Sequence, residues 1–196
     1  MTTPPPAPSR VDEVLDWLTR PPRPWLTAAI AVVTAAVGIA QLVDSSLYDR
    51  LCRDPAEIRL GAWWRLGTAM FVQDGRAAGL VFNLVILAVF GIIAERVLGR
   101  WRWLVLYFGC GLFGQAVSFW WLDSTGAGNS MCVAGLVGGL TTVALLAPDR
   151  FGPRRPARPV LYVVPALAVV GTLLHDNHGP PLLLGMGLGY LTLVRD

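Results

Sequence analysis

The chain has 196 residues, of which 54% are hydrophobic and 15% charged, and its mean hydropathy is +0.54. A soluble domain of this composition could not keep its surface polar, so the sequence predicts an integral membrane protein. The net charge of +3 is small and dispersed, and this gives no indication of nucleic-acid binding. The three cysteines are odd in number and lack a CxxC spacing, so they are interpreted as packing residues, with neither a zinc site nor a disulfide framework.

The N-terminal segment, residues 1–24, is proline-rich at its start and then carries Val11, Val14, Leu15 and Leu18 at helical spacing. This pattern predicts a short interfacial helix on a cytoplasmic segment. A cleavable signal peptide is less favoured, because the first apolar stretch is long enough to span a bilayer and five more follow it.

Six apolar stretches are long enough, or nearly so, for the roughly 20 residues that a transmembrane helix needs. They cover residues 25–43, 79–94, 103–122, 130–148, 160–174 and 180–194. The predicted fold is therefore an all-α membrane domain of six transmembrane helices over residues 25–196. Its first loop, residues 44–78, is long, and its five arginines nearly balance four aspartates and one glutamate, which favours a folded element. Trp63, Trp64 and Arg65 in this loop are expected at the level of the lipid headgroups.

Arginine placement in the short loops predicts the orientation of the chain, because cytoplasmic loops retain positive charge. The third and fifth loops, residues 123–129 and 175–179, carry no arginine. The second and fourth loops carry seven: Arg96, Arg100, Arg102, Arg150, Arg154, Arg155 and Arg158. Both termini are therefore expected in the cytoplasm, and loops one, three and five outside a membrane that is interpreted as the bacterial cytoplasmic membrane.

Polar residues within spans are costly and usually mark function, and four stand out: Asn83, Ser130, Asp176 and His178. Ser130 follows a run of small and polar residues and begins the fourth span. Free N–H groups and the helix dipole at that position favour developing negative charge. A purely structural helix cap is the alternative interpretation, because serine favours helix starts.

His178 opens the sixth span, and Pro181, Gly185 and Gly189 lie on the same helical face. The fourth span has a matching face of small residues after Ser130, formed by Ala134 and Gly138, with Gly135 and Gly139 beside them. Two small-residue faces allow close helix packing, which would bring Ser130 near His178. A histidine there could act as a general base for the serine hydroxyl. A loop histidine exposed to water is the alternative.

Several motifs between residues 61 and 191 resemble those of the rhomboid family. They are the Trp64-Arg65 pair within residues 61–71, Phe82-Asn83 with Glu95-Arg96 at the second span, Gly128-Asn129-Ser130-Met131 with Gly135-Leu136, and His178 followed by Gly185 and Gly189. The resemblance implies a six-helix bundle in which Ser130 is the nucleophile, His178 the general base and Asn83 an oxyanion donor.

The sequence departs from the family's pattern at three positions. Met131 replaces the glycine after the nucleophile and adds bulk beside it. Gly79 stands where many members have a second-span histidine, which would remove one oxyanion donor, and Pro181 replaces a glycine three residues after the histidine. A lowered rate, a narrower substrate range and a loss of proteolysis are all compatible with these changes.

Three functions compete. The first is an intramembrane serine protease whose partners are transmembrane protein substrates and membrane lipids, with no cofactor and no metal. The second is a catalytically inactive rhomboid-like protein that binds transmembrane helices. The third, a transporter or channel, would need ionisable groups along a path through the spans, whereas here they cluster at one depth. His175, Asp176 and His178 are too local a group to indicate zinc.

Overall fold

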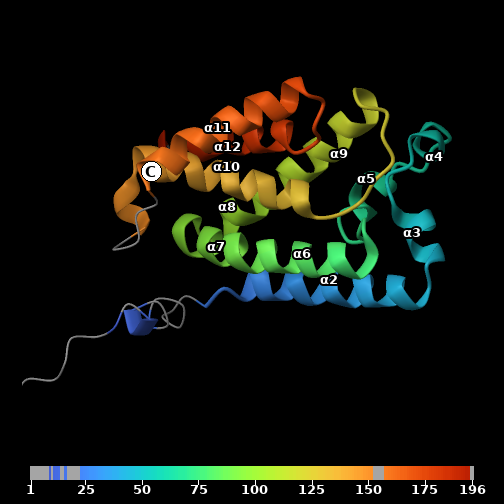
Figure 1. Cartoon of the computed structure of the whole chain (residues 1–196), viewed down its shortest axis with the longest axis horizontal. Coiled ribbons are helices and arrows are strands. Elements are labelled where there is room, and N and C mark those ends of the chain that lie inside the picture. The colour runs from blue at the N-terminus through green and yellow to red at the C-terminus, as the bar shows by residue number, and fades with distance from the viewer. Residues whose placement is uncertain (1–8, 10, 14–15, 17–22, 152–156, 195–196) are drawn as a thin grey trace, which may run out of the picture.

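The computed structural model describes residues 9, 11–13, 16, 23–151 and 157–194 and shows a bundle of helices (Figure 1). The spans are α2 (Trp25–Val43); α6 (Arg76–Ile86), η1 (Leu87–Gly91) and α7 (Ile92–Leu98) as one run; α8 (Arg100–Leu104), η2 (Val105–Gly109) and α9 (Cys110–Trp120) as another; then α10 (Ser130–Leu146), α11 (Arg158–Leu173) and α12 (Gly179–Val194). Within the described part no strand occurs beyond one isolated bridge, so the prediction of an all-α membrane bundle is confirmed.

The helices fall into two length classes. The runs Trp25–Val43, Arg76–Leu98 and Arg100–Trp120 have 19, 23 and 21 residues and are long and apolar enough to cross a membrane. The other three, α10, α11 and α12, are apolar but have only 17, 16 and 16 residues. Large hydrophobic side chains along α11, such as Tyr162, Leu167 and Val170, are exposed, which suits a helix whose outer face contacts lipid.

Predicted and observed span boundaries differ by a few residues. The second span begins at Arg76 instead of residue 79, because Gly75 in the left-handed region (φ 71°) turns the chain directly into the helix. It ends at Leu98, before Gly99 at φ 82°. Val14, Leu15 and Leu18 of the predicted interfacial helix lie outside the described residues.

The first loop folds into three short helices, α3 (Ser46–Leu51), α4 (Pro55–Arg59) and α5 (Arg65–Thr68), which gather at one end of the bundle (Figure 1). Trp63 and Trp64 are exposed, whereas Arg65 is buried and its partners are backbone groups of the protein. Its buried guanidinium donates to the carbonyls of Asp49 at 2.7 Å and Cys52 at 3.1 Å. Arg65 therefore joins α5 to α3 inside the loop.

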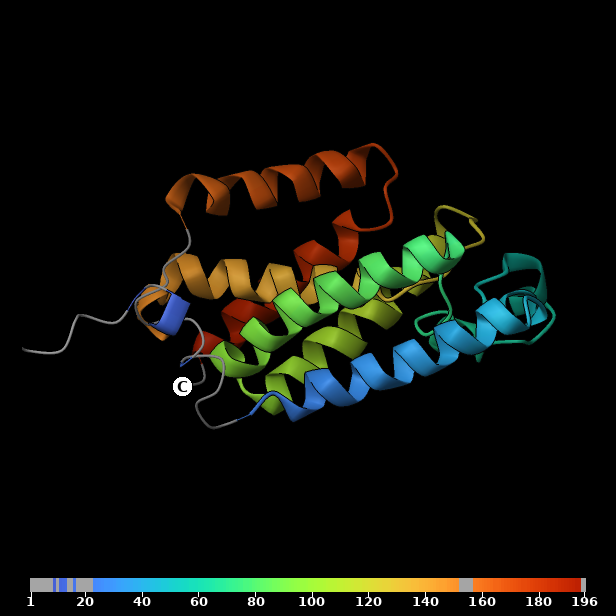
Figure 2. The ribbon, with the colours of Figure 1, turned by 60° about the horizontal axis from the view of Figure 1, so that its bottom comes forward.

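Helix α10 is the centre of the bundle, with α2 and α6 along one side and α11 along the other (Figures 1 and 2). Nearly every residue from Met131 to Ala144 is buried. Its neighbours include α12, α9, η2 and α11. A helix that is apolar all round is stable when protein or lipid surrounds it, and α10 is surrounded by protein.

The N-terminus of the first span is capped by a carboxylate of the second span. Glu95 is buried and accepts from the backbone N–H groups of Leu26 at 3.1 Å and Thr27 at 2.8 Å, and from the Thr27 hydroxyl at 2.8 Å. These N–H groups have no partner within α2, and the negative charge suits the positive end of the helix dipole. Glu95 thus stabilises the start of α2.

Candidate active site

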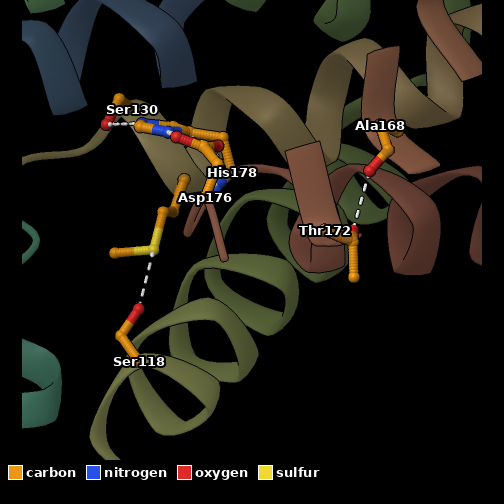
Figure 3. A network of polar contacts seen from close by, with 7 residues as sticks. Ser118, Ser130, Ala168, Thr172, Asp176 and His178 are labelled. Atoms are coloured by element: carbon orange, nitrogen blue, oxygen red, sulfur yellow. Dashed lines mark hydrogen bonds and ion pairs between the residues drawn. The ribbon is translucent and has the colours of Figure 1, made fainter. Parts of the chain in front are cut away.

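Ser130 and His178 meet at one end of the central helix pair. Ser130 is the first residue of α10, and His178 immediately precedes α12, whose first turn it closes through the Leu182 N–H···O bond of 3.2 Å. The Nε2 atom of His178 lies 2.8 Å from the Oγ atom of Ser130 (Figure 3). This is a full hydrogen bond between a hydroxyl and a potential base.

Glycines allow α10 and α12 to approach backbone to backbone. A Cβ on Gly138 would lie 2.1 Å from the carbonyl oxygen of Leu182, and one on Gly185 would lie 2.2 Å from that of Gly135. A Cβ on Gly189 would lie 2.9 Å from the Cα of Gly139. Close backbone approach at these positions fixes how far apart the two helices, and hence their terminal side chains, can be.

Gly135 and Gly139 also face the third span. A Cβ on Gly135 would lie 2.3 Å from the Cβ of Cys110, and one on Gly139 would lie 2.6 Å from a methyl group of Leu106. Both positions are therefore crowded from two sides, by α12 and by the α9 and η2 region. The third span and α12 together hold α10 in place.

The segment before the nucleophile is joined to the first loop by a buried arginine. Arg53 and Gly126 exchange two backbone hydrogen bonds of 2.9 and 3.1 Å. The Arg53 guanidinium donates through Nε to the Ser124 carbonyl at 2.7 Å and through another nitrogen to the side chain of Gln115. Arg53 is only 1% exposed, so its charge is fully engaged in setting the path of residues 124–126.

A second set of contacts continues this connection to the residues next to Ser130. The Asp74 carboxylate accepts from the Ala127 N–H at 3.0 Å and from the Tyr48 hydroxyl. Burial and this hydrogen bond raise the pKa of the Tyr48 phenol above its ordinary value, which keeps the donor protonated. The Gly128 N–H donates to the Ala69 carbonyl at 2.8 Å, and Gly128 adopts φ +122°, which favours glycine.

Asn83 lies close to the nucleophile. A Cβ on Gly128 would be 3.1 Å from the Asn83 Nδ2 atom and 3.9 Å from Ser130 Oγ, so both groups border the same small volume. Asn83 is buried, and its Nδ2 donates to the Oε1 atom of Gln73 at 2.6 Å.

Asn129, directly before Ser130, is fully buried and closes the first turn of α10 through its carbonyl.

The three departures from the family's pattern each have a local explanation. Met131 is buried against α9, where Ser118 Oγ lies 3.8 Å from its sulfur (Figure 3) and a Cβ on Gly114 would lie 2.9 Å from that sulfur. Pro181 packs at the same glycine, 3.1 Å from the Cβ position. A Cβ on Gly79 would lie 1.6 Å from the Asp74 carbonyl oxygen, so this backbone accepts only glycine there.

A cavity of about 430 Å³ is lined by residues that include Trp121, Ser124, His175 and Asp176, of which Asp176 contacts His178. The His178 side chain itself is 45% exposed. Among the residues that the structure describes, no group of three His, Cys, Asp or Glu side chains could hold a metal ion.

Sequence reasoning missed Gln73, Arg53 and Asp74. Each is a polar residue in the first loop or at its end, where polar side chains are common. Each forms a hydrogen bond with a residue 10 to 71 positions away in the sequence. Only the burial of Arg53 and Gln73 distinguishes them, and burial is not visible in one sequence.

The fold and this contact define a helical integral membrane protein with a serine–histidine pair at the start of a membrane-embedded helix. A model of the Rhomboid domain matches residues 60–193. This is more than half of the chain, which therefore belongs to the rhomboid family.

Two curated proteins are similar to the chain. Rhomboid protease GluP of Bacillus subtilis (strain 168) is 38% identical over 88 residues, which are 45% of this chain and 17% of that protein. The putative rhomboid protease YdcA of the same organism is 29% identical over 119 residues, 60% of this chain and 58% of that protein. The match thus spans less than two thirds of either relative.

Proposed function

We propose that this protein is an intramembrane serine protease in which Ser130 is the nucleophile and His178 the general base. The observation that carries the proposal is the 2.8 Å contact between His178 Nε2 and Ser130 Oγ, made by residues 48 positions apart. A binding protein of the same fold would need neither side chain in this geometry. The names of the two relatives, a rhomboid protease and a putative rhomboid protease, support the same activity.

The chemistry follows from the positions of the groups. Ser130 Oγ attacks the scissile carbonyl while its proton passes to His178 Nε2, and the histidine then donates that proton to the leaving amine. The negative charge on the tetrahedral oxygen is stabilised by the free N–H groups at the start of α10 and by the amide of Asn83. Water, which can reach His178 because its side chain is 45% exposed, then releases the acyl group.

The proposed substrates are transmembrane segments cleaved near the outer face of a bacterial membrane. The arginine distribution supports cytoplasmic termini. In that orientation loops one, three and five, which surround the serine–histidine pair, lie on the other side of the membrane. A substrate helix must unwind there, because its backbone hydrogen bonds otherwise occupy the scissile carbonyl. Reporter fusions after Asp149 and after Asp176 should report opposite sides of the membrane; signals from the same side would contradict the orientation.

The decisive experiment compares fluorophosphonate labelling and cleavage of a transmembrane substrate in liposomes. Ser130→Ala should abolish both, and His178→Ala should abolish cleavage. The double variant should be no worse, because nucleophile and base act as a unit. Asn83→Ala should retain measurable activity, reduced by about 10²–10³-fold, because one oxyanion donor is lost. Ser45→Ala, an exposed loop serine, is the control, and full activity of Ser130→Ala would rule out the proposed nucleophile.

A catalytically inactive protein that binds transmembrane helices is the second candidate. It is favoured by the 2.6 Å hydrogen bond from Asn83 Nδ2 to Gln73, because this bond already engages the proposed oxyanion donor. It is also favoured by Gly79, which stands where many family members have a histidine that would be a second donor. A wild-type protein that is inert towards the probe and several substrates, yet still binds a transmembrane helix, would favour this function.

A further inference from the structure

The imidazole of His178 has a second polar partner, on the side opposite Ser130. The Nδ1 atom lies 3.1 Å from Oδ1 and 3.4 Å from Oδ2 of Asp176, while Nε2 faces Ser130 Oγ at 2.8 Å. Figure 3 shows the contact between Ser130 and His178, with Asp176 next to His178. Both ring nitrogens are therefore engaged, one by a hydroxyl and one by a carboxylate.

The fold fixes the position of this carboxylate. The Asp176 N–H donates to the Gly171 carbonyl near the end of α11 at 2.8 Å, and Oδ1 accepts from the backbone N–H of His178, also at 2.8 Å. Gly179 brings α12 against α11, since a Cβ there would lie 2.3 Å from the Thr172 hydroxyl. Asp176 is thus anchored on α11 and His178 on α12.

Resting on the proposed protease function, we infer that Asp176 is a positioning residue that orients the His178 ring and keeps a proton on its Nδ1 atom. A neutral imidazole carries one proton, and a carboxylate facing Nδ1 accepts a hydrogen bond from it. The lone pair of Nε2 then faces Ser130, as general-base catalysis requires. When Ser130 loses its proton to Nε2, the ring becomes a cation beside the ionised carboxylate, which stabilises it.

The same contacts also have a local structural role that the test must separate. The bond from the His178 N–H to Asp176 Oδ1 is a turn before a helix, for which asparagine is as suitable as aspartate. Asp176→Asn therefore preserves the turn and removes the charge. The side chains of His178 and Asp176 are 45% and 52% exposed, so solvent screens the pair, and the rate should fall by roughly 10- to 100-fold, less than for a buried triad.

Nitrogen NMR of the imidazoles tests proton placement without any need for activity. The chain has two histidines, so the full protein, labelled with ¹⁵N-histidine and purified without a histidine tag, gives two ring systems, and His175→Gln assigns them. With both rings neutral, His178 should carry its proton on Nδ1 in the wild type and shift towards the Nε2–H form in Asp176→Ala, which removes the oxygen that faces Nδ1. Unchanged tautomer populations in Asp176→Ala would overturn the inference.

Kinetics tests the contribution to the rate. Asp176→Asn should lower kcat by about 10- to 100-fold with KM and thermal stability nearly unchanged. Asp123→Asn is the matched control, because Asp123 forms an exposed ion pair with Arg59 at 2.7 Å and its loss removes the same charge from the same end of the molecule. An unchanged kcat in Asp176→Asn would overturn the inference, and so would an equal loss in Asp123→Asn. A wild type with the Nδ1–H form but no proteolysis would instead overturn the proposed function and leave the positioning intact.

Discussion

Two helix interfaces in this bundle are both built on glycine, yet they differ in what the glycine contacts. Between α10 and α12, the Cβ positions of Gly138 and Gly185 fall 2.1 and 2.2 Å from backbone oxygens. Between α2 and α6, the Cβ position of Gly38 falls 2.4 Å from the end of the Leu80 side chain. A side-chain end can rotate away, whereas a backbone oxygen moves only with its helix. Distance alone would rank the two interfaces together, and the atom type separates them.

The two interfaces also differ in whether they position the serine–histidine pair. The α10–α12 interface ends at Ser130 and His178, whose 2.8 Å contact depends on the helix separation. The α2–α6 interface carries neither residue. We therefore expect substitutions to change stability and activity together at the first interface, and to be largely absorbed at the second.

The largest effect is expected for Gly185→Leu. The new side chain meets the Gly135 carbonyl, so the helices must separate, at a cost of more than about 3 kcal/mol together with loss of probe labelling. Thermal unfolding in detergent measures the first and fluorophosphonate labelling the second. Gly187→Leu on the same helix is the control, because beyond its own stretch of helix backbone nothing lies within 4 Å of its Cβ position. Equal stability of the two variants would refute the proposed rigidity.

Met131→Gly, which restores the family's residue, should destabilise the protein by about 2–5 kcal/mol. The side chain fills space against Gly114 and Ser118 on α9, and its removal leaves a cavity. Because the thioether packs there, we expect no gain in rate. Faster cleavage by Met131→Gly at unchanged stability would show that Met131 crowds the nucleophile instead.

Where α7 contacts the start of α2, Glu95→Gln should lower stability by about 1–2 kcal/mol. Glutamine keeps the size of the side chain but loses the charge that faces the first turn of α2 through Leu26 and Thr27. Probe labelling per folded molecule should be unchanged, since α2 does not contribute to the serine–histidine pair. Chemical denaturation of the purified protein measures the difference, and labelling that falls below the folded fraction would contradict the separation of roles.

The smallest effect is expected for Gly38→Ala, within about 1 kcal/mol of the wild type. Rotation of Leu80 has a small cost, and alanine favours the helix over glycine by up to about 1 kcal/mol. A loss comparable to that of Gly185→Leu would mean that Leu80 cannot move and that the two interfaces are equivalent.

Hydropathy predicts the spans well, because the requirement for a continuous apolar stretch is local. The predicted first span at 25–43 coincides with α2, and the fourth differs from α10 only at its C-terminal end. The π-helical turns η1 and η2, inside the second and third spans, leave no such signal in the sequence. Their composition is that of any membrane helix, and only the packed structure shows where the hydrogen-bond pattern changes.

The predicted site residues belong to local sequence motifs, whereas the side chains that contact them are distant in the sequence and belong to no motif. Ser130, His178 and Asn83 were identified from motifs, and the structure brings all three together; their catalytic roles stay predictions. The contacts of Arg53 with Ser124 and of Gln73 with Asn83 depend on tertiary folding. Asp176 is visible in the sequence, two residues before His178, but its direction is set by α11.

The buried arginine Arg53 bears on where the folding unit begins. The family match starts at residue 60, but Arg53 lies before it and bonds to the segment that precedes the nucleophile. Gln73 exchanges hydrogen bonds with Gln41, and Glu95 bonds to Thr27, so two more partners also lie upstream. A fragment cut at the edge of the match would leave these buried polar groups without partners. A piece of this chain that keeps these three contacts must therefore include α2, which lies before residue 60, where the family match begins.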